Sequence, residues 1–193
     1  GKYKLAGENG ADFPNIPEPD SVETVKINSQ YLLEAINNTV FATSSDELRP
    51  AMTGVYFQLD MNKLICVATD AHKLVKYSTH QLAGEVSTTF IVPKKALNLL
   101  KNALPANDGV TISFNKANAF FSFGGMNLVC RLIDARYPDY NAVIPVDNPN
   151  HMNVNRSDFQ NSLKRIAIYA NKTTNQVVLE VTDKSLTVSA QDL

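Results

Sequence analysis

The sequence predicts an α+β fold, in which amphipathic helices cover one face of antiparallel sheets made of short strands. Short runs of alternating apolar and polar residues are separated by turn-forming Asn, Asp, Lys and Gly residues, a pattern typical of antiparallel strands. Longer segments place apolar residues three and four positions apart, the spacing of a helix with one buried side. Helix and strands then recur in the same order, which predicts an internal duplication.

The first copy of the repeat begins with a helix predicted over residues 28–44, with Ser29 as its N-cap. The apolar residues that recur at helical spacing there are Tyr31, Leu32, Ala35, Ile36, Val40 and Phe41. A hairpin of strands 54–60 and 64–69 follows, and a third strand covers 74–78. A further strand-like run, residues 2–5, stands near the start of the chain.

The second copy is predicted to contain a strand over 88–92 and a helix over 93–103, with Pro93 in the first helical turn, where proline is well tolerated. Three strands follow. Their predicted ranges are 110–114, 119–123 and 128–133. A third copy begins with a helix near Asn155, and its apolar stripe is Phe159, Leu163, Ile166, Ala167 and Ala170. A hairpin of strands 177–181 and 186–190 follows it.

A longer repeat predicts the domain organisation. The step Asp12-Phe13-Pro14-Asn15 returns as Arg136-Tyr137-Pro138-Asp139, in each case after a strand-like run and before a proline-containing linker. The two junctions are separated by about the length of one domain. We therefore expect residues 1–19 to end a first domain, 20–145 to form a complete middle domain, and 146–193 to begin a third. The chain is expected to be a piece of a longer protein.

Composition predicts an ordinary globular protein without a cofactor. The chain has 193 residues and a net charge of −1, and no apolar run reaches the roughly 18 residues of a membrane helix. It carries no signal-peptide pattern, and no membrane association is expected. The two cysteines, Cys66 and Cys130, stand inside apolar strand patterns without metal-type spacing, which favours buried thiols in a reducing compartment over a zinc site.

Signals of catalysis are weak. The sequence has no phosphate-binding Gly-Lys-Ser/Thr loop, no cluster of metal ligands and no nucleophile elbow. Asp70 and His72 could form a catalytic pair, but a turn in which Asp70 accepts hydrogen bonds from backbone amides is favoured. A small hydrolytic enzyme using Asp70 and His72 stays open as an alternative, as does a structural interaction module that does not bind DNA.

Two segments carry a family resemblance. The run LRPAMTGV over 48–55 and the run VATDAHKLV over 67–75 resemble the middle domain of the bacterial beta sliding clamp of DNA polymerase III. The resemblance implies the DNA-clamp fold, with duplicated helix-plus-strand units and helices on one face of curved sheets. It also implies a non-catalytic processivity factor of the bacterial cytoplasm. In that family a homodimer of three-domain subunits encircles double-stranded DNA.

The resemblance further implies a pocket that takes a short peptide from the polymerase III catalytic subunit, the clamp loader and other proteins with a clamp-binding motif. The positions that match it are Met52, Thr69, Asp70, Ala71, His72, Lys73, Leu74, Pro138 and Val143. Ala71 replaces a common glycine, Lys73 a common arginine, and Ala142 stands where some members carry arginine. Part of the pocket wall would lie beyond Leu193. Read without the resemblance, Met52, Leu74 and Val143 would be ordinary core residues.

Basic residues on two predicted helices are the candidate DNA contacts. They are Lys94, Lys95 and Lys101 on the second helix, and Lys164 and Arg165 on the third. Such helices can face phosphates without reading bases, which gives attraction that depends on salt but not on sequence. The alternative is a solvated helix face. Arg49, in the loop after the first helix, is a weaker candidate for DNA or for the pocket edge.

Overall fold

The computed structural model describes residues 1–13, 15–18 and 22–191, and the chain divides into two units. Unit 1 is Gly1–Ile144 and unit 2 is Pro145–Leu193. The predicted domain boundary between residues 19 and 20 and the predicted Pro14 step lie outside the described residues. The predicted boundaries of the three domains stay a prediction.

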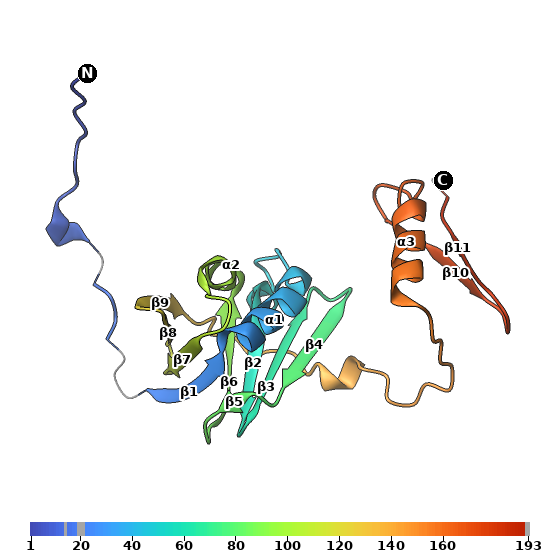
Figure 1. The fold of residues 1–193 in the computed structure, drawn as a ribbon, viewed down its shortest axis with the longest axis horizontal. Helices are drawn as coiled ribbons and strands as arrows, with labels where there is room; N and C mark the ends of the chain where they lie inside the picture. Colours follow the sequence, from blue (N-terminus) through green and yellow to red (C-terminus); the bar gives the residue numbers. More distant parts are fainter. Residues whose placement is uncertain (14, 19–21, 192–193) are drawn as a thin grey trace. The chain divides into compact units, whose positions relative to one another are not determined.

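Unit 1 contains the same series of elements twice: a strand, a helix and three strands (Figure 1). The first series is β1 (Glu23–Asn28), α1 (Ser29–Thr39), β2 (Gly54–Asp60), β3 (Lys63–Thr69) and β4 (Leu74–Thr79). The second is β6 (Ser87–Pro93), α2 (Lys94–Ala103), β7 (Gly109–Phe114), β8 (Asn118–Phe123) and β9 (Met126–Arg131). A short strand, β5 (Leu82–Ala83), which the sequence pattern did not reveal, pairs with β1.

The two repeats exchange their first strands. One sheet has the order β5-β1-β7-β8-β9 and the other β4-β3-β2-β6, so β1 joins the second repeat and β6 joins the first. The ladders are long: β1 pairs with β7 from Glu23 to Asn28, and β2 pairs with β6 from Gly54 to Asp60. All the strand pairs found among the described residues are antiparallel, so the predicted α+β class is confirmed.

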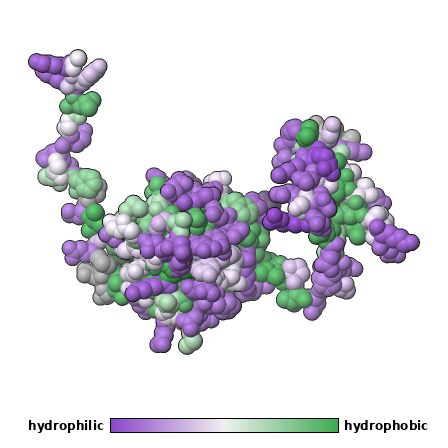
Figure 2. Space-filling model, viewed as in Figure 1, coloured by the Kyte–Doolittle hydropathy of each residue, from purple (hydrophilic) through white to green (hydrophobic). Residues whose placement is uncertain are grey.

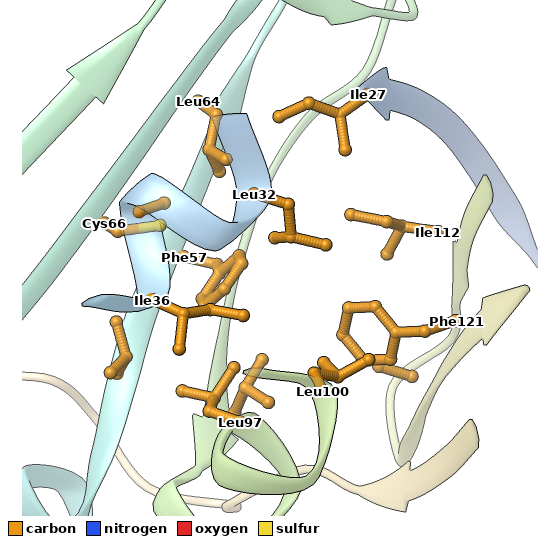
Figure 3. Close-up of a cluster of buried hydrophobic side chains, with 14 of the residues drawn as sticks. Ile27, Leu32, Ile36, Phe57, Leu64, Cys66, Leu97, Leu100, Ile112 and Phe121 are labelled. Carbon is orange, nitrogen blue, oxygen red and sulfur yellow. The ribbon is translucent and has the colours of Figure 1, made fainter. Parts of the chain in front are cut away.

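Both helices and both sheets of unit 1 share one core (Figure 3). Alternate residues of each strand face the helices, because side chains along a strand alternate between the two faces of a sheet. In β2, for example, Phe57 is 1% exposed and packs in this core, while its neighbour Tyr56 faces the opposite side. That opposite face of the β4-β3-β2-β6 sheet carries a second, smaller cluster, to which the chain following β9 contributes Tyr137 and Tyr140.

The first helix differs from its prediction at both ends. Its N-cap is Asn28, whose side chain accepts a hydrogen bond from the Gln30 amide, and not Ser29. The Ser29 hydroxyl instead accepts a hydrogen bond from the Asp108 amide before β7. The α-helix ends at Thr39 and tightens into a 3-10 turn, η2 (Val40–Ala42), which leaves Phe41 59% exposed rather than in the buried stripe.

The strand predicted at residues 2–5 is not formed. Residues 1–9 carry no regular element, and Tyr3 and Leu5 are more than nine-tenths exposed. A strand needs a neighbour for its backbone hydrogen bonds, and in the part of unit 1 that is described no other strand pairs with this run. A 3-10 turn, η1 (Gly10–Asp12), follows it.

Unit 2 contains α3 (Arg156–Ile166) and a hairpin of β10 (Val178–Val181) and β11 (Leu186–Ser189). Asn155 caps α3 by accepting hydrogen bonds from the amides of Ser157 and Asp158, and the helix ends before the predicted Ala170. Hydrophilic residues gather over α3, and hydrophobic ones lie along the strands (Figure 2). Across both units, the described helices include none with the length and apolar character needed to span a bilayer.

Candidate functional site

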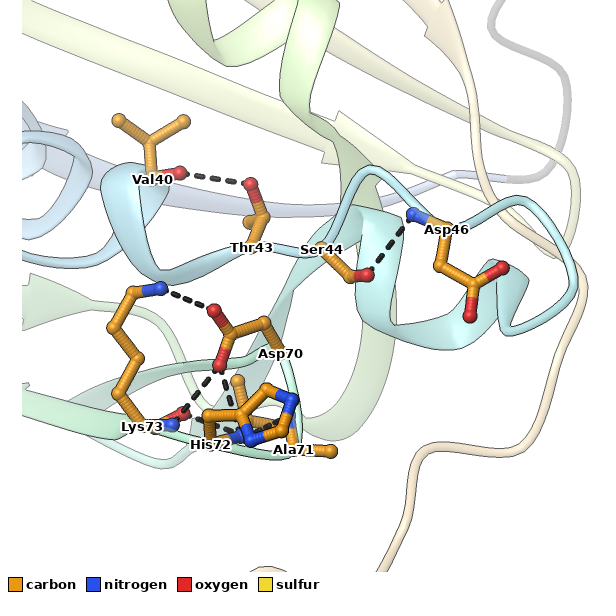
Figure 4. A network of polar contacts seen from close by, with 9 residues as sticks. Val40, Thr43, Ser44, Asp46, Asp70, Ala71, His72 and Lys73 are labelled. Atoms are coloured by element: carbon orange, nitrogen blue, oxygen red, sulfur yellow. Dashed lines mark hydrogen bonds and ion pairs between the residues drawn. The ribbon is translucent and has the colours of Figure 1, made fainter. Parts of the chain in front are cut away.

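The turn between β3 and β4 is built by its own polar side chains (Figure 4). The Thr69 hydroxyl donates to the Lys73 carbonyl at 2.7 Å and accepts from the Ala71 amide at 3.1 Å. Asp70 Oδ1 accepts from the amides of His72 and Lys73 at 3.0 and 2.9 Å. This is the turn that the sequence predicted, with Asp70 bound to backbone amides.

The charge of Asp70 is balanced within the same turn. Asp70 Oδ2 forms an ion pair with Lys73 Nζ, and this contact, followed by the hydrogen bond from the Lys73 amide, holds the pKa of Asp70 below its usual range. Both carboxylate oxygens therefore serve the turn. Asp70 is not arranged to orient the exposed His72 ring as a catalytic pair would require, so the hydrolase alternative is not favoured.

Ala71 stands at the tip of this turn in a conformation that favours glycine. Its φ is 75°, in the left-handed region, where a Cβ atom approaches the following carbonyl oxygen. The glycine that is common at this position in the resembled family would adopt the same φ without strain. The substitution noted in the sequence is therefore tolerated at a cost in local stability.

The chain after β9 forms a wall opposite this turn. Residues 137–143 lie against the outer face of the β4-β3-β2-β6 sheet, with Tyr137 and Tyr140 buried and Pro138 and Val143 exposed. The Tyr137 hydroxyl donates to the Val67 carbonyl at 3.3 Å. Burial raises the pKa of Tyr137 to about 12, so this hydroxyl keeps its proton for the hydrogen bond at neutral pH.

A cleft of about 380 Å³ lies between the turn and the wall. Its lining residues are Met52, Thr69, Ala71, His72, Lys73, Leu74, Pro138, Asp139, Tyr140 and Val143. The structure thus brings together all the residues predicted for the peptide pocket except Asp70, which supports the turn from outside the lining. The sequence prediction did not include Asp139 and Tyr140, which also line the cleft. The run Tyr137-Pro138-Asp139-Tyr140 offered a signal for Tyr140, because it places a second aromatic residue three positions after the first.

A second hollow of about 450 Å³ adjoins the cleft and shares Met52, Pro138 and Asp139 with it. Arg49 and Arg136 stand at this hollow, and Arg49 Nε binds Asp46 Oδ2 at 2.9 Å. A hydrogen bond from the Leu48 amide and then the Arg49 guanidinium hold the pKa of Asp46 below its usual value. Arg49 thus lines the hollow beside the cleft and not the cleft itself, and both of its predicted roles, at the pocket edge and with DNA, stay predictions.

The basic residues predicted to meet DNA are surface residues. Lys94 and Lys95 occupy the first turn of α2, beside a hollow of about 570 Å³ that Ser44, Thr53 and Asn98 also line. Lys101 is exposed in the last turn of the same helix, outside that lining. In unit 2, Lys164 and Arg165 are exposed on α3. Their contact with DNA stays a prediction.

The two thiols differ in burial, and the described residues show no cluster of metal ligands. Cys66 is buried and Cys130 is partly buried, and burial raises the pKa of both thiols, that of Cys130 to about 11. Within residues 1–13, 15–18 and 22–191, no group of three His, Cys, Asp or Glu side chains is placed to hold a metal ion.

Comparison with known proteins agrees with the resemblance. A family model described as "DNA polymerase III beta subunit, central domain" matches residues 26–139. The beta sliding clamp of Synechococcus elongatus is 29% identical over 100% of this chain and 54% of its own length, and that of Bacillus subtilis is 29% identical over 92% and 47%. The chain thus spans about half the length of these relatives.

Solved structures agree with the sequence comparison. The crystal structure of the DNA polymerase sliding clamp from Bacillus subtilis matches with a TM-score of 0.87 and 27% identity, over 94% of this chain and 49% of that one. The beta subunit from Pseudomonas aeruginosa matches with a TM-score of 0.87 and 25% identity, over 95% and 51%. The predicted clamp fold is confirmed, and the chain belongs to the family of DNA polymerase III beta subunits, the beta sliding clamps.

Proposed function

We propose that this chain is part of a sliding clamp that encircles duplex DNA and recruits the polymerase, the clamp loader and other replication or repair proteins through the cleft beside the β3–β4 turn. It works in the bacterial cytoplasm, as a homodimeric ring of the longer protein, and raises processivity without catalysing nucleotide transfer. Residues 1–19 belong to the first clamp domain, 20–145 to the middle one and 146–193 to the third.

The observation that carries this proposal is the cleft itself. Three segments far apart in the sequence converge on one concave surface: Met52, the turn over 69–74 and the wall over 137–143. The cleft offers apolar side chains such as Leu74 and Val143 beside a few polar groups, which suits a peptide with one or two large apolar anchors. Each buried anchor contributes about 1.5–3 kcal/mol, so few side chains dominate affinity and several partners can use the site in turn.

The peptide half of the proposal is tested by fluorescence anisotropy. A labelled Gln-Leu-x-Leu-Phe peptide is titrated with this chain and with the Leu74→Asp variant, and saturable binding that the variant loses is expected. Leu99→Asp is the matched control, because Leu99 is 55% exposed on α2 and lines neither the cleft nor the adjoining hollow. Equal peptide binding by Leu74→Asp and the parent chain would refute the site. Absence of peptide binding by both this chain and the full-length protein would refute peptide recruitment.

The DNA half of the proposal assigns Lys94, Lys95 and Lys101 to weak phosphate contacts, with Lys164 and Arg165 on α3 in the same role. Replacing the three α2 lysines by Glu in the full-length ring is expected to shorten retention on nicked circular DNA and to flatten its salt dependence. Lys116→Glu is the control, since Lys116 is exposed in the turn between β7 and β8 and belongs to neither basic helix. Unchanged retention of the triple variant would contradict the assignment.

A further inference from the structure

The wall of the cleft is a loop and not a strand, so its position needs an explanation. Its one regular element is the short turn η4 (Asn141–Val143), and Val143 is 69% exposed. The Ile133 amide donates to the Ile91 carbonyl of β6 just before the wall begins. Among the described residues, the hydrogen bonds that tie the wall itself to the sheet come from tyrosine hydroxyls: Tyr137 to the Val67 carbonyl, and Tyr140 to Gln58 Oε1 at 3.0 Å.

Both tyrosine rings of the wall rest on a third tyrosine, Tyr56, which projects from β2. The rings of Tyr56 and Tyr137 are stacked, with centroids 4.7 Å apart and planes 14° from parallel. The ring of Tyr140 is tilted by 60° against Tyr56 at 6.2 Å, and Lys76 Nζ lies 5.2 Å from the Tyr140 centroid. Offset-stacked and tilted pairs at these separations are attractive beyond their buried area. We call Tyr56, Tyr137 and Tyr140 the tyrosine clasp.

Tyr56 lies under the cleft without lining it. The cleft is lined by Tyr140 and the adjoining hollow by Tyr137, whereas Tyr56 lines neither. Because β2 pairs with β3 on one side and β6 on the other, Tyr56 stands on an interior strand of its sheet. A side chain on such a strand has a fixed position. The β3–β4 turn begins at the end of β3, in the same sheet, so rings that stack on Tyr56 are held at a set distance from that turn.

We propose that Tyr56 is a positioning residue for partner binding: through the tyrosine clasp it holds the wall over 137–143 in place, so that the cleft is open before a peptide arrives. This inference rests on the proposed peptide-binding role of the cleft. A preformed site binds more tightly than one that must be ordered, since ordering the wall would oppose binding. Loss of the clasp is therefore expected to weaken peptide binding on the order of tenfold.

Hydrogen exchange of the chain without peptide tests the positioning directly. Tyr56→Ala is expected to speed exchange of the Asn141 and Ile144 amides, which donate to Asp139 Oδ1 and to the Asn141 carbonyl, at least about tenfold. The amides of α2 and of the β7–β8 ladder are expected to keep their protection. Tyr56→Phe keeps the stacked ring and is expected to restore slow exchange. Phe120→Ala is the matched control, because Phe120 is a buried aromatic residue, 7% exposed, on a strand of the other sheet.

Peptide titrations of the same proteins complete the test. Tyr56→Ala is expected to bind the labelled peptide about tenfold more weakly, with Tyr56→Phe and Phe120→Ala near the parent chain. Unchanged exchange of the wall in Tyr56→Ala, or equal loss of wall protection in Phe120→Ala, would overturn the inference. Failure of the parent chain and the full-length protein to bind peptide would refute the proposed function instead, and the exchange data would still decide whether Tyr56 positions the wall.

Discussion

Replacing Gly54 by Ala is the sharpest perturbation that the structure suggests, because it adds one methyl group where there is no room. Gly54 begins β2, and its φ of −124° suits any residue, so space is the obstacle. A Cβ atom there would lie 2.6 Å from the Val92 carbonyl oxygen and 2.8 Å from both Ile133 Cδ1 and Ile91 Cγ2. The isoleucine side chains can rotate, but the carbonyl belongs to β6, which is paired with β2 along its whole length.

The expected cost follows from that close contact. Overpacking that shifts backbone typically destabilises by about 1–3 kcal/mol. For a domain of this size, such a loss lowers Tm by roughly 4–12 °C. Gly109→Ala is the matched control: it begins β7, a Cβ there meets no heavy atom within 4 Å, and its φ is outside the left-handed region. We expect it to change stability by about 0–1 kcal/mol, in the stabilising direction, since alanine restricts the unfolded chain.

Differential scanning calorimetry of the two variants and the parent chain makes the comparison. We expect a clearly lower Tm for Gly54→Ala and an unchanged or higher one for Gly109→Ala. This expectation is refuted if Gly54→Ala has the same Tm as the parent chain, or if both variants lose stability equally. The first outcome would mean that β2 and β6 can separate at this point without loss of stability, and the second that the loss does not come from the close contact at Gly54.

Other predictions concern the β3–β4 turn and the thiols. Ala71→Gly relieves the left-handed φ and is expected to stabilise the chain by about 0.5–1 kcal/mol in urea unfolding; destabilisation would contradict the strain. The folded-state pKa of Asp70 lies below its unfolded value. The ionised Asp70 carboxylate therefore stabilises the folded chain fully above about pH 4, and this stabilisation is lost as pH falls through the lowered pKa. Asp70→Asn should therefore lose stability at neutral pH and show a shallower acid-side decline, and an unchanged decline would exclude this role. A thiol reagent should label Cys130 before Cys66, because Cys130 is only partly buried; the reverse order of labelling would contradict this difference in burial.

Local pattern was sufficient to predict most strands. The predicted strand at 54–60 coincides with β2, and the one at 110–114 differs from β7 by a single residue. Period-two alternation and the turn residues that bound each run depend on the run itself, so they can be read without knowing its neighbours. The β3–β4 turn was predictable for the same reason, since Asp70 bonds amides only two and three positions ahead.

Features that depend on distant partners were not predictable in this way. Ser29 looked like an N-cap, but its hydroxyl is taken by the Asp108 amide from the second repeat, and Asn28 caps the helix instead. The role of Tyr140 in the cleft depends on a ring contact with Tyr56 of β2, which is distant in the sequence. The exchange of β1 and β6 is of this kind too, because nothing in a strand's own sequence states which ladder it will join.

The strand exchange also links the two surfaces to which we assign function. Gly54 pairs with Pro93, so the 3-10 turn η3 (Pro50–Thr53) and the start of α2 meet at one point of the sheet. Met52 of that turn lines the cleft, and its neighbour Thr53 lines the hollow beside Lys94 and Lys95. A methyl group at Gly54 should therefore disturb both surfaces, and in the full-length ring we expect Gly54→Ala to weaken peptide binding and DNA retention together. Leu74 lines the cleft but not the hollow beside Lys94 and Lys95, so Leu74→Asp should weaken peptide binding alone. Loss of both activities in Leu74→Asp, with its Tm unchanged, would show that the cleft and the basic helix do not act as separate surfaces.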